Sequence, residues 1–156
     1  MDVAITVVVI IGITSFVSER TSLEIVPLAS VTMVPIMNTE LFTEKKVRTQ
    51  NDLMEIDQIV IGDSNPKGIT FGLLDSGKKW RILDNNFKRE IILSGLGWGH
   101  LPLHTIEQEL SDKKIAILDF EDIHPRELEI NLIRLRKQHF GPVAKKLWEE
   151  LISFQL

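Results

Sequence analysis

The stretch 94–104 reads SGLGWGHLPLH and decides the fold of this chain, because it predicts a helix end, a glycine turn and a short buried strand in succession. Gly95 can adopt the left-handed backbone conformation that ends a helix. The two following glycines alternate with apolar residues, and Leu101-Pro-Leu103 continues the apolar run as a strand. Pro102 indicates a strand end or an edge strand, since proline has no backbone N–H to donate.

The sequence on both sides of this stretch predicts helices. Asp84 and Asn85 are good N-caps for a helix over Asn86–Ser94. Downstream, Thr105 and Gln108 have the spacing of a capping box and predict that a second helix begins there. The expected order is therefore helix, glycine turn, short strand, helix.

A glycine-rich nucleotide cradle is the competing interpretation of the same glycines. That motif needs the spacing G-x-G-x-x-G after a strand and before a helix. Here the spacing is G-x-G-x-G, and the preceding segment has a helical pattern. A tight packing turn is the better interpretation, although a small α/β enzyme that binds a nucleotide or phosphate stays an alternative.

The other apolar runs predict strands that alternate with helices. Strand patterns cover Val3–Ile11, Glu24–Met37 (as one long or two consecutive segments), Gln58–Ile61, Lys79–Leu83, Lys114–Leu118 and Leu128–Leu135. Helical patterns cover Asn51–Ile56 and the segment that Gly141-Pro142 opens, with Pro142 at the first helical position. This alternation predicts an α/β fold with a largely parallel sheet.

Open sheets of this kind bind ligands beyond the carboxyl ends of their strands, and two turns fit that position. One is Gly62–Gly68, after the strand that ends at Ile61, where backbone N–H groups and the side chains of Asp63–Asn65 can hold a polar ligand. The other is the glycine turn Gly95–Gly99. Asp and Ser are also ordinary turn residues, so both a structural and a ligand-binding role stay open.

Composition excludes several classes of protein. With 156 residues and 44% hydrophobic content, the chain can bury a real core. A formal net charge of −4 argues against direct nucleic-acid binding, which needs a basic face. The lack of cysteine excludes disulfides and thiolate metal sites and fits a reducing compartment. The apolar segment 3–16 is shorter than a membrane span and is expected to be a buried strand.

No catalytic or metal-binding set is evident in the sequence. His100 and His104 are four residues apart, but Pro102 lies between them and makes a shared helix face unexpected. Both are expected to be structural or solvent-exposed. His124 and His139 have no evident catalytic partner. Of the remaining tryptophans, Trp80 is expected in the core, and Trp148 is expected on the packed face of an amphipathic helix.

Several stretches together resemble one known family. They are Asp2–Ile5, Leu28–Pro35, Gln58–Ser64, Phe71–Leu74 with Lys79–Ile82, Gly95–Pro102, and Arg126–Ile133 with Gly141–Ala144. In this combination they resemble the C-terminal effector-binding domain of LysR-type transcriptional regulators. The resemblance covers nearly all of residues 24–156, and one branch of the family carries tryptophan in its glycine turn.

The resemblance implies a periplasmic-binding-protein-like (type II) fold of two α/β subdomains. A small-molecule effector is expected in the cleft between them, where it changes how a dimer or tetramer grips promoter DNA. Residues 1–25 would then be a remnant of the first subdomain, 26–118 the second subdomain, and 119–156 the return strand and last helix of the first. The chain looks truncated, and DNA would be bound only through a helix-turn-helix domain that it lacks.

The resemblance also implies the contact residues and the setting. Asp63, Ser64 and Asn65 match the ligand loop of the second subdomain, and Gly97 and Trp98 flank the cleft. Trp98 is equally well explained as a core residue beside a glycine. No catalysis, cofactor, metal or membrane contact is expected, and the location is expected to be cytoplasmic. A solute-binding lobe of the same fold stays a further alternative.

Overall fold

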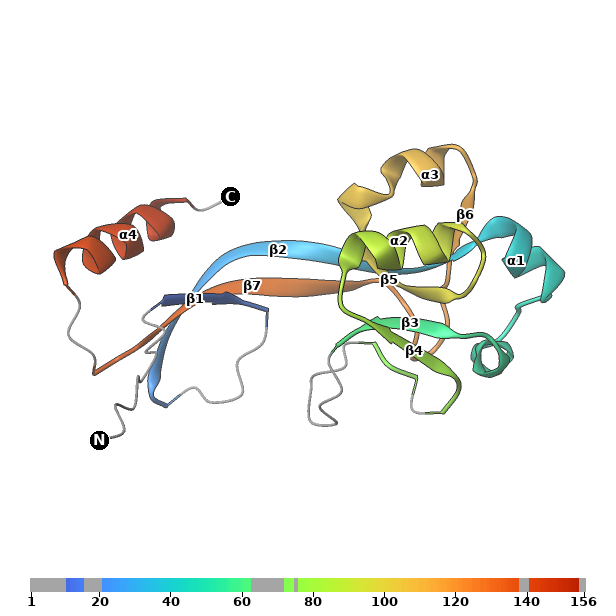
Figure 1. Ribbon diagram of the computed structural model, residues 1–156, viewed down its shortest axis with the longest axis horizontal. Helices are drawn as coiled ribbons and strands as arrows, with labels where there is room; N and C mark the ends of the chain where they lie inside the picture. The colour runs from blue at the N-terminus through green and yellow to red at the C-terminus, as the bar shows by residue number, and fades with distance from the viewer. Residues whose placement is uncertain (1–10, 16–20, 63–71, 75, 138–140, 155–156) are drawn as a thin grey trace, which may run out of the picture. The chain divides into compact units, whose positions relative to one another are not determined.

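The computed structural model describes residues 11–15, 21–62, 72–74, 76–137 and 141–154, which fall into two compact units (Figure 1). Unit 1 comprises the described parts of 1–31 and 128–156, and unit 2 those of 32–127. The strands are β1 (Ile11–Thr14), β2 (Leu23–Asn38), β3 (Gln58–Ile61), β4 (Lys79–Ile82), β5 (Trp98–Pro102), β6 (Ile115–Ile117) and β7 (Arg126–Leu135). The helices are α1 (Thr39–Glu44), α2 (Asn85–Leu93), α3 (Glu107–Ser111), α4 (Pro142–Ser153) and the 3₁₀ helices η1 (Gln50–Glu55) and η2 (Leu103–Thr105).

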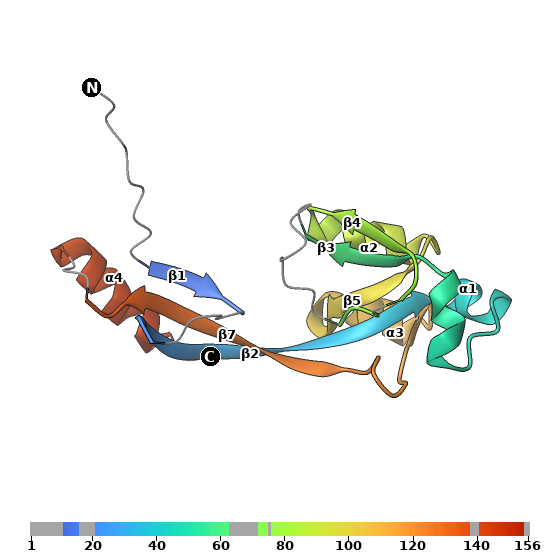
Figure 2. The same cartoon turned by 90° about the horizontal axis from the view of Figure 1, so that it is seen from below.

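The sheet of unit 2 has the order β2-β5-β3-β4, with β6 also paired to β2 (Figure 2). Strands β3, β4, β5 and β6 run in one direction, as the alternating pattern predicts, but β2 runs antiparallel to β5 and β6. The prediction of a largely parallel sheet is therefore wrong for β2. This strand begins in unit 1, and β1 is the element before it in the described residues, so these residues show no helical crossover that would give β2 the parallel direction.

Two hydrophobic clusters form the core of unit 2. The first contains Ile59 of β3, Leu101 of β5 and the helix residues Ile91 and Ile92, so it seals α2 against the sheet. The second contains Met37, Val47, Leu53, Ile56, Leu74, Trp98, Leu118 and Ile123. Because side chains alternate between the two faces of a strand, Leu101 and Trp98 of β5, three positions apart, face the first and the second cluster respectively.

The helix, the glycine turn and the strand predicted around residues 94–104 are confirmed. Asp84 caps α2, because its side chain accepts a hydrogen bond of 2.7 Å from the backbone N–H of Phe87. Gly95 follows the helix with φ +74°, the left-handed conformation expected at this position. Strand β5 ends at Pro102, as the missing N–H predicts.

The predicted capping box at Thr105 is wrong. The chain leaves β5 through the short helix η2, and the Thr105 hydroxyl donates a hydrogen bond of 2.7 Å to the carbonyl oxygen of Pro102. Helix α3 begins at Glu107 without a side-chain cap. The hydroxyl is thus already engaged with the preceding turn and does not cap the next helix.

Gly97 and Gly99 allow β5 to lie unusually close to β3. A Cβ at Gly97 would overlap the carbonyl oxygen of Asp57 and lie 2.8 Å from Cδ1 of Ile59. At Gly99 it would lie 2.6 Å from the carbonyl oxygen of Ile59. Real Cβ atoms do not approach backbone this closely, so any larger residue would push the two strands apart.

Unit 1 is held together by an arginine that contacts two elements. The Arg134 guanidinium carbon of β7 lies 4.2 Å from the ring centre of Trp148 on α4, and Arg134 Nε donates a hydrogen bond of 2.6 Å to Glu24 of β2. Trp148 is buried, as predicted for the stripe of this amphipathic helix. Val143 and Leu147, which are apolar residues of the same helix, are exposed.

Other predictions have mixed outcomes. Residues 24–37 form one continuous strand within β2, and β3 has the predicted bounds. The segment 51–56 forms the 3₁₀ helix η1 where a short helix was predicted. Trp80 is 42% exposed, so its prediction as a core residue is wrong, because β4 lies at the edge of the sheet. Of the predicted strand Val3–Ile11, all but its last residue lies outside the described residues.

Replacing Gly97 by alanine tests whether the close approach of β5 to β3 stabilises the fold. We expect Gly97→Ala to lower the free energy of unfolding by about 2–3 kcal/mol, because the new methyl group meets backbone that cannot move cheaply. Gly141→Ala is the matched control, since nothing lies within 4 Å of a Cβ at that position. Urea denaturation followed by circular dichroism measures both, and equal losses would contradict the steric account.

Candidate functional site

The carboxyl ends of the parallel strands are the first place to look for a ligand site in unit 2. Strand β3 ends at Ile61, and Gly62 follows it. The side-chain nitrogen Nη1 of Arg81 lies 3.4 Å from the position that a Cβ of Gly62 would take, so a guanidinium stands beside the exit of β3. The predicted contacts Asp63, Ser64 and Asn65 come next in the chain but lie outside the described residues.

Gly97 and Trp98 lie at the other end of β3 from Gly62. Gly97 packs against Asp57, which precedes β3, and the backbone N–H of Trp98 donates to the Asp57 carbonyl oxygen at 3.0 Å. The Trp98 side chain is fully buried, and its indole N–H has no hydrogen-bond partner in the described part of the chain. The described geometry therefore assigns both residues a packing role, and contact with an effector stays a prediction.

His100 is a buried neutral histidine. Burial lowers its pKa to about 3, with smaller electrostatic contributions from Lys88, Arg126 and His124. Gly72, at φ +62°, lies directly against the imidazole ring and leaves no room for a Cβ. His104 is exposed, so the two histidines do not form a pair. In the described segments, no group of three or more His, Cys, Asp or Glu residues could hold a metal ion.

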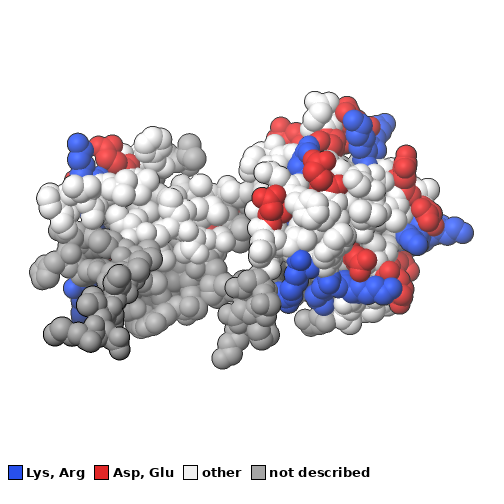
Figure 3. All heavy atoms as spheres, in the orientation of Figure 1, with Lys and Arg blue, Asp and Glu red and all other residues white. Residues whose placement is uncertain are grey.

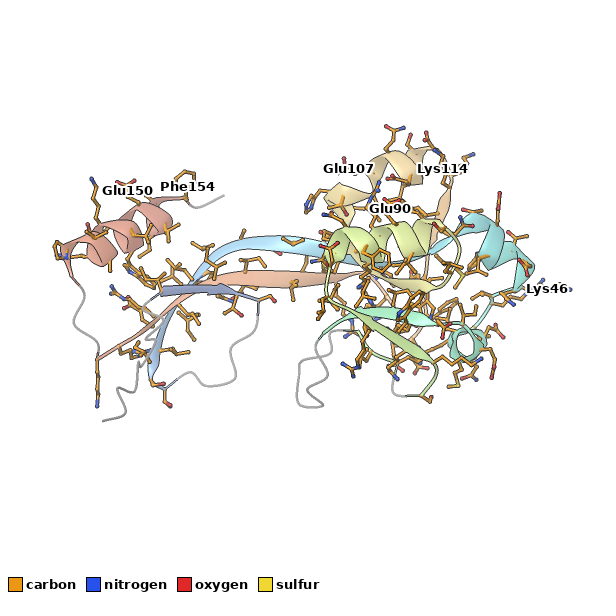
Figure 4. The ribbon with its side chains drawn as sticks, in the orientation of Figure 1. Lys46, Glu90, Glu107, Lys114, Glu150 and Phe154 are labelled. Atoms are coloured by element: carbon orange, nitrogen blue, oxygen red, sulfur yellow. The ribbon has the colours of Figure 1, made fainter. Side chains whose placement is uncertain are left out.

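Lys88 is a functional candidate that the sequence analysis did not identify. It lies on α2 and is only 7% exposed, whereas Glu90, two residues further along the helix, is exposed (Figure 4). A Cβ at Gly99 would lie 3.1 Å from Lys88 Cε, so this glycine makes room for the lysine stem beneath the helix. The sequence did contain a signal for this burial. Lys88 lies three residues before Ile91 and four before Ile92, so helical spacing places it on the apolar face of the helix.

The Lys88 ammonium has no compensating charge in the described parts of the chain. Asp84 uses its carboxylate to cap the helix, and the neighbouring Arg89 pairs with Glu90 and Glu109. Burial alone lowers the pKa of Lys88 from its ordinary value of 10.5 to about 8. A cation that is buried and unpaired costs folding free energy, which makes Lys88 a candidate for ligand binding.

A cavity of about 420 Å³ is the competing site in unit 2. Its lining includes Gln50, Gly72, Ser76, Asp122 and Arg126. Most of its polar groups bond to one another: the side chain of Gln50 makes hydrogen bonds of 3.0 and 2.9 Å with Asp122, and Arg126 donates to the Asp122 carbonyl oxygen. The Nε of Arg126 is buried without a hydrogen-bond partner among the described residues, so this cavity keeps one donor that could serve a ligand.

Side chains of both charges occur on the face of unit 2 that Figure 3 shows, with a run of basic ones along its lower edge. Among the helices that the structure describes, none is both long enough and apolar enough to cross a membrane.

Replacing Lys88 by methionine tests whether a buried, uncompensated charge is present. Because the pKa is lowered in the folded state, wild-type stability is lowest below pH 8 and rises as the pH increases from about 8 to 10.5. We expect Lys88→Met to raise the free energy of unfolding at pH 7 by on the order of 2–3 kcal/mol and to remove most of this rise. Lys45→Met, at an exposed site, is the control in urea denaturation at pH 7, 8.5 and 10. Destabilisation at pH 7 would show that the charge is compensated.

Solved structures with a similar fold include three regulators that are distant from this chain in sequence. The full-length regulator LysG from Corynebacterium glutamicum with bound effector Arg has a TM-score of 0.68 and 18% identity, over 95% of this chain and 51% of that one. ArgP from Mycobacterium tuberculosis has a TM-score of 0.69 and 10% identity, over 94% and 51%. The C-terminal domains of a LysR family protein from Agrobacterium tumefaciens give 0.70 and 13%, over 94% and 70%.

The chain thus spans about half the length of the first of these regulators, and at such identities the likeness shows the fold alone. No curated protein sequence matches the chain. A family profile does match: the LysR substrate binding domain aligns with residues 5–155, nearly the whole sequence. The periplasmic-binding-protein-like α/β fold that the resemblance implies is therefore confirmed, and the chain belongs to the LysR substrate binding domain family.

Proposed function

We propose that this chain is the effector-binding part of a LysR-type transcriptional regulator. The observation that carries the proposal is the match of the LysR substrate binding domain to residues 5–155. In this role the chain senses a small molecule and controls transcription through a DNA-binding helix-turn-helix domain, without catalysing a reaction. LysG, one of the similar structures, has the effector Arg bound, which supports a small-molecule ligand here.

The proposed mechanism is a ligand-biased conformational equilibrium. An effector that binds one conformation more tightly than another shifts the population toward the first, by no more than its difference in affinity. In a dimer or tetramer of the regulator, that shift would change the grip on promoter DNA. The whole protein would act in the cytoplasm, and residues 1–25, 26–118 and 119–156 would belong to the first, second and first regulatory subdomains.

We propose Asp63, Ser64 and Asn65 as effector contacts, with Gly97 and Trp98 as further members of the site. The position of the first three residues after β3 and Gly62, at the carboxyl edge of the parallel strands, supports their assignment. The support for the last two is weaker, because their described contacts are with Asp57 and the core.

A screen of metabolites tests the sensing role directly. Thermal unfolding of the chain is recorded with each compound, and compounds that stabilise it are titrated by intrinsic tryptophan fluorescence. We expect saturable binding of at least one compound, which is recovered unchanged after incubation. Chemical conversion of the bound compound would support the enzyme alternative instead.

Asp63→Asn tests the proposed contact loop with the compound that the screen identifies. Loss of a charged hydrogen bond to the ligand costs about 1.5–3 kcal/mol, so we expect the dissociation constant to rise about tenfold or more. Asp119→Asn, at an exposed position of unit 2, is expected to bind like the wild type. Equal affinity of all three proteins would remove Asp63 from the site.

A further inference from the structure

We infer that Lys88 binds an anionic group of the effector, either a carboxylate or a phosphate. This inference rests on the proposed sensing function and names the chemical class of its ligand. Nothing in the sequence resemblance assigns a role to this residue, and the geometry of α2 and β5 carries the argument.

The first step is the burial of a charge without a partner. Only 7% of the Lys88 surface is exposed. Its stem packs against Gly99, next to the side chain of Ile92. Within the described residues no carboxylate lies at ion-pair distance from its ammonium, although the adjacent Arg89 has two such partners. An unpaired buried charge destabilises a protein by several kcal/mol, and an anionic ligand would supply the missing counter-charge.

The second step is the position of the Lys88 stem between the start of α2 and β5. Helix α2 follows the carboxyl end of β4, and Lys88 lies in its first turns. A Cβ at Gly99, the second residue of β5, would lie 3.1 Å from Lys88 Cε, so the lysine stem runs beneath the helix toward β5. Because Lys88 lies near the N-terminus of α2, the positive end of the helix dipole adds to its own positive charge and favours an anion there.

The third step is the comparison with the cavity lined by Arg126. Arg126, the cation among the described residues that line that cavity, donates a hydrogen bond from Nη2 to the Asp122 carbonyl oxygen, and its Nε is buried without a described partner. The Asp122 carboxylate lines the same cavity and would repel an anion. An anionic ligand group is thus better accommodated at Lys88 than at Arg126.

An NMR titration tests the inference on the chain itself. The protein is labelled with ¹³C-lysine, and the Cε signal of Lys88 is assigned from its absence in Lys88→Met, or in Lys88→Arg if the first variant does not fold. Acetate, inorganic phosphate and neutral acetamide are then added at pH 7 and constant ionic strength. The anion that saturates the shift at the lower concentration identifies the carboxylate or the phosphate as the preferred group.

We expect acetate or phosphate to shift the Lys88 signal saturably, with no shift from acetamide and none at the exposed Lys45. A Lys88 signal that moves no more than that of Lys45 with either anion would overturn the inference. These titrations use no effector, so they decide the role of Lys88 even if the metabolite screen finds no ligand.

The effector itself supplies the second readout. We expect Lys88→Met to weaken binding of the compound from the screen at least tenfold, while Lys45→Met leaves the affinity unchanged. If Lys88→Met binds that compound as tightly as the wild type, the inference is wrong and the sensing function stands. If no compound binds, the sensing function is what fails.

Discussion

The close approach of β5 to β3 is the constraint on which unit 2 depends. Glycine at positions 97 and 99 lets the backbone of β5 lie against the carbonyl oxygens of Asp57 and Ile59. This approach places Trp98 in one hydrophobic cluster and Leu101 in the other, so a single strand joins both cores. It also leaves the space that the stem of Lys88 fills beneath α2. The glycines are thus explained by packing, with no need for a phosphate to bind them.

The same packing creates the feature of greatest functional interest. A methionine at position 88 would fill the space under α2 without burying a charge, so lysine is a costly choice on stability alone. Functional sites commonly retain residues that lower stability, because a ligand compensates them only when it binds. When an anionic ligand neutralises the Lys88 charge, it stabilises the region of α2 and β5. Ligand binding is then linked to the stability of this region, as a sensing domain requires.

Local signals in the sequence predicted the local structure well. The Asp84 cap, the left-handed Gly95 and the Pro102 strand end follow from backbone properties of single residues, and the structure has all three. Predictions that depended on distant partners were less successful. The direction of β2 depends on its pairing with β5 and β6, and the exposure of Trp80 depends on the edge position of β4 in the sheet. The Thr105 hydroxyl donates its hydrogen bond to a carbonyl group in the preceding turn. None of these partners can be read from a local pattern.

The candidate site was only partly predictable for the same reason. The strand end at Ile61 and the turn that follows were accessible from apolar periodicity and turn residues. Lys88 looked like one more helix lysine, because its missing counter-charge becomes evident only once the surroundings of α2 are assembled. A crystal structure of the chain with its effector tests the account most directly. We predict an anionic ligand group within 4 Å of Lys88 Nζ; a ligand bound in the Arg126 cavity, with Lys88 uncontacted, would contradict this prediction.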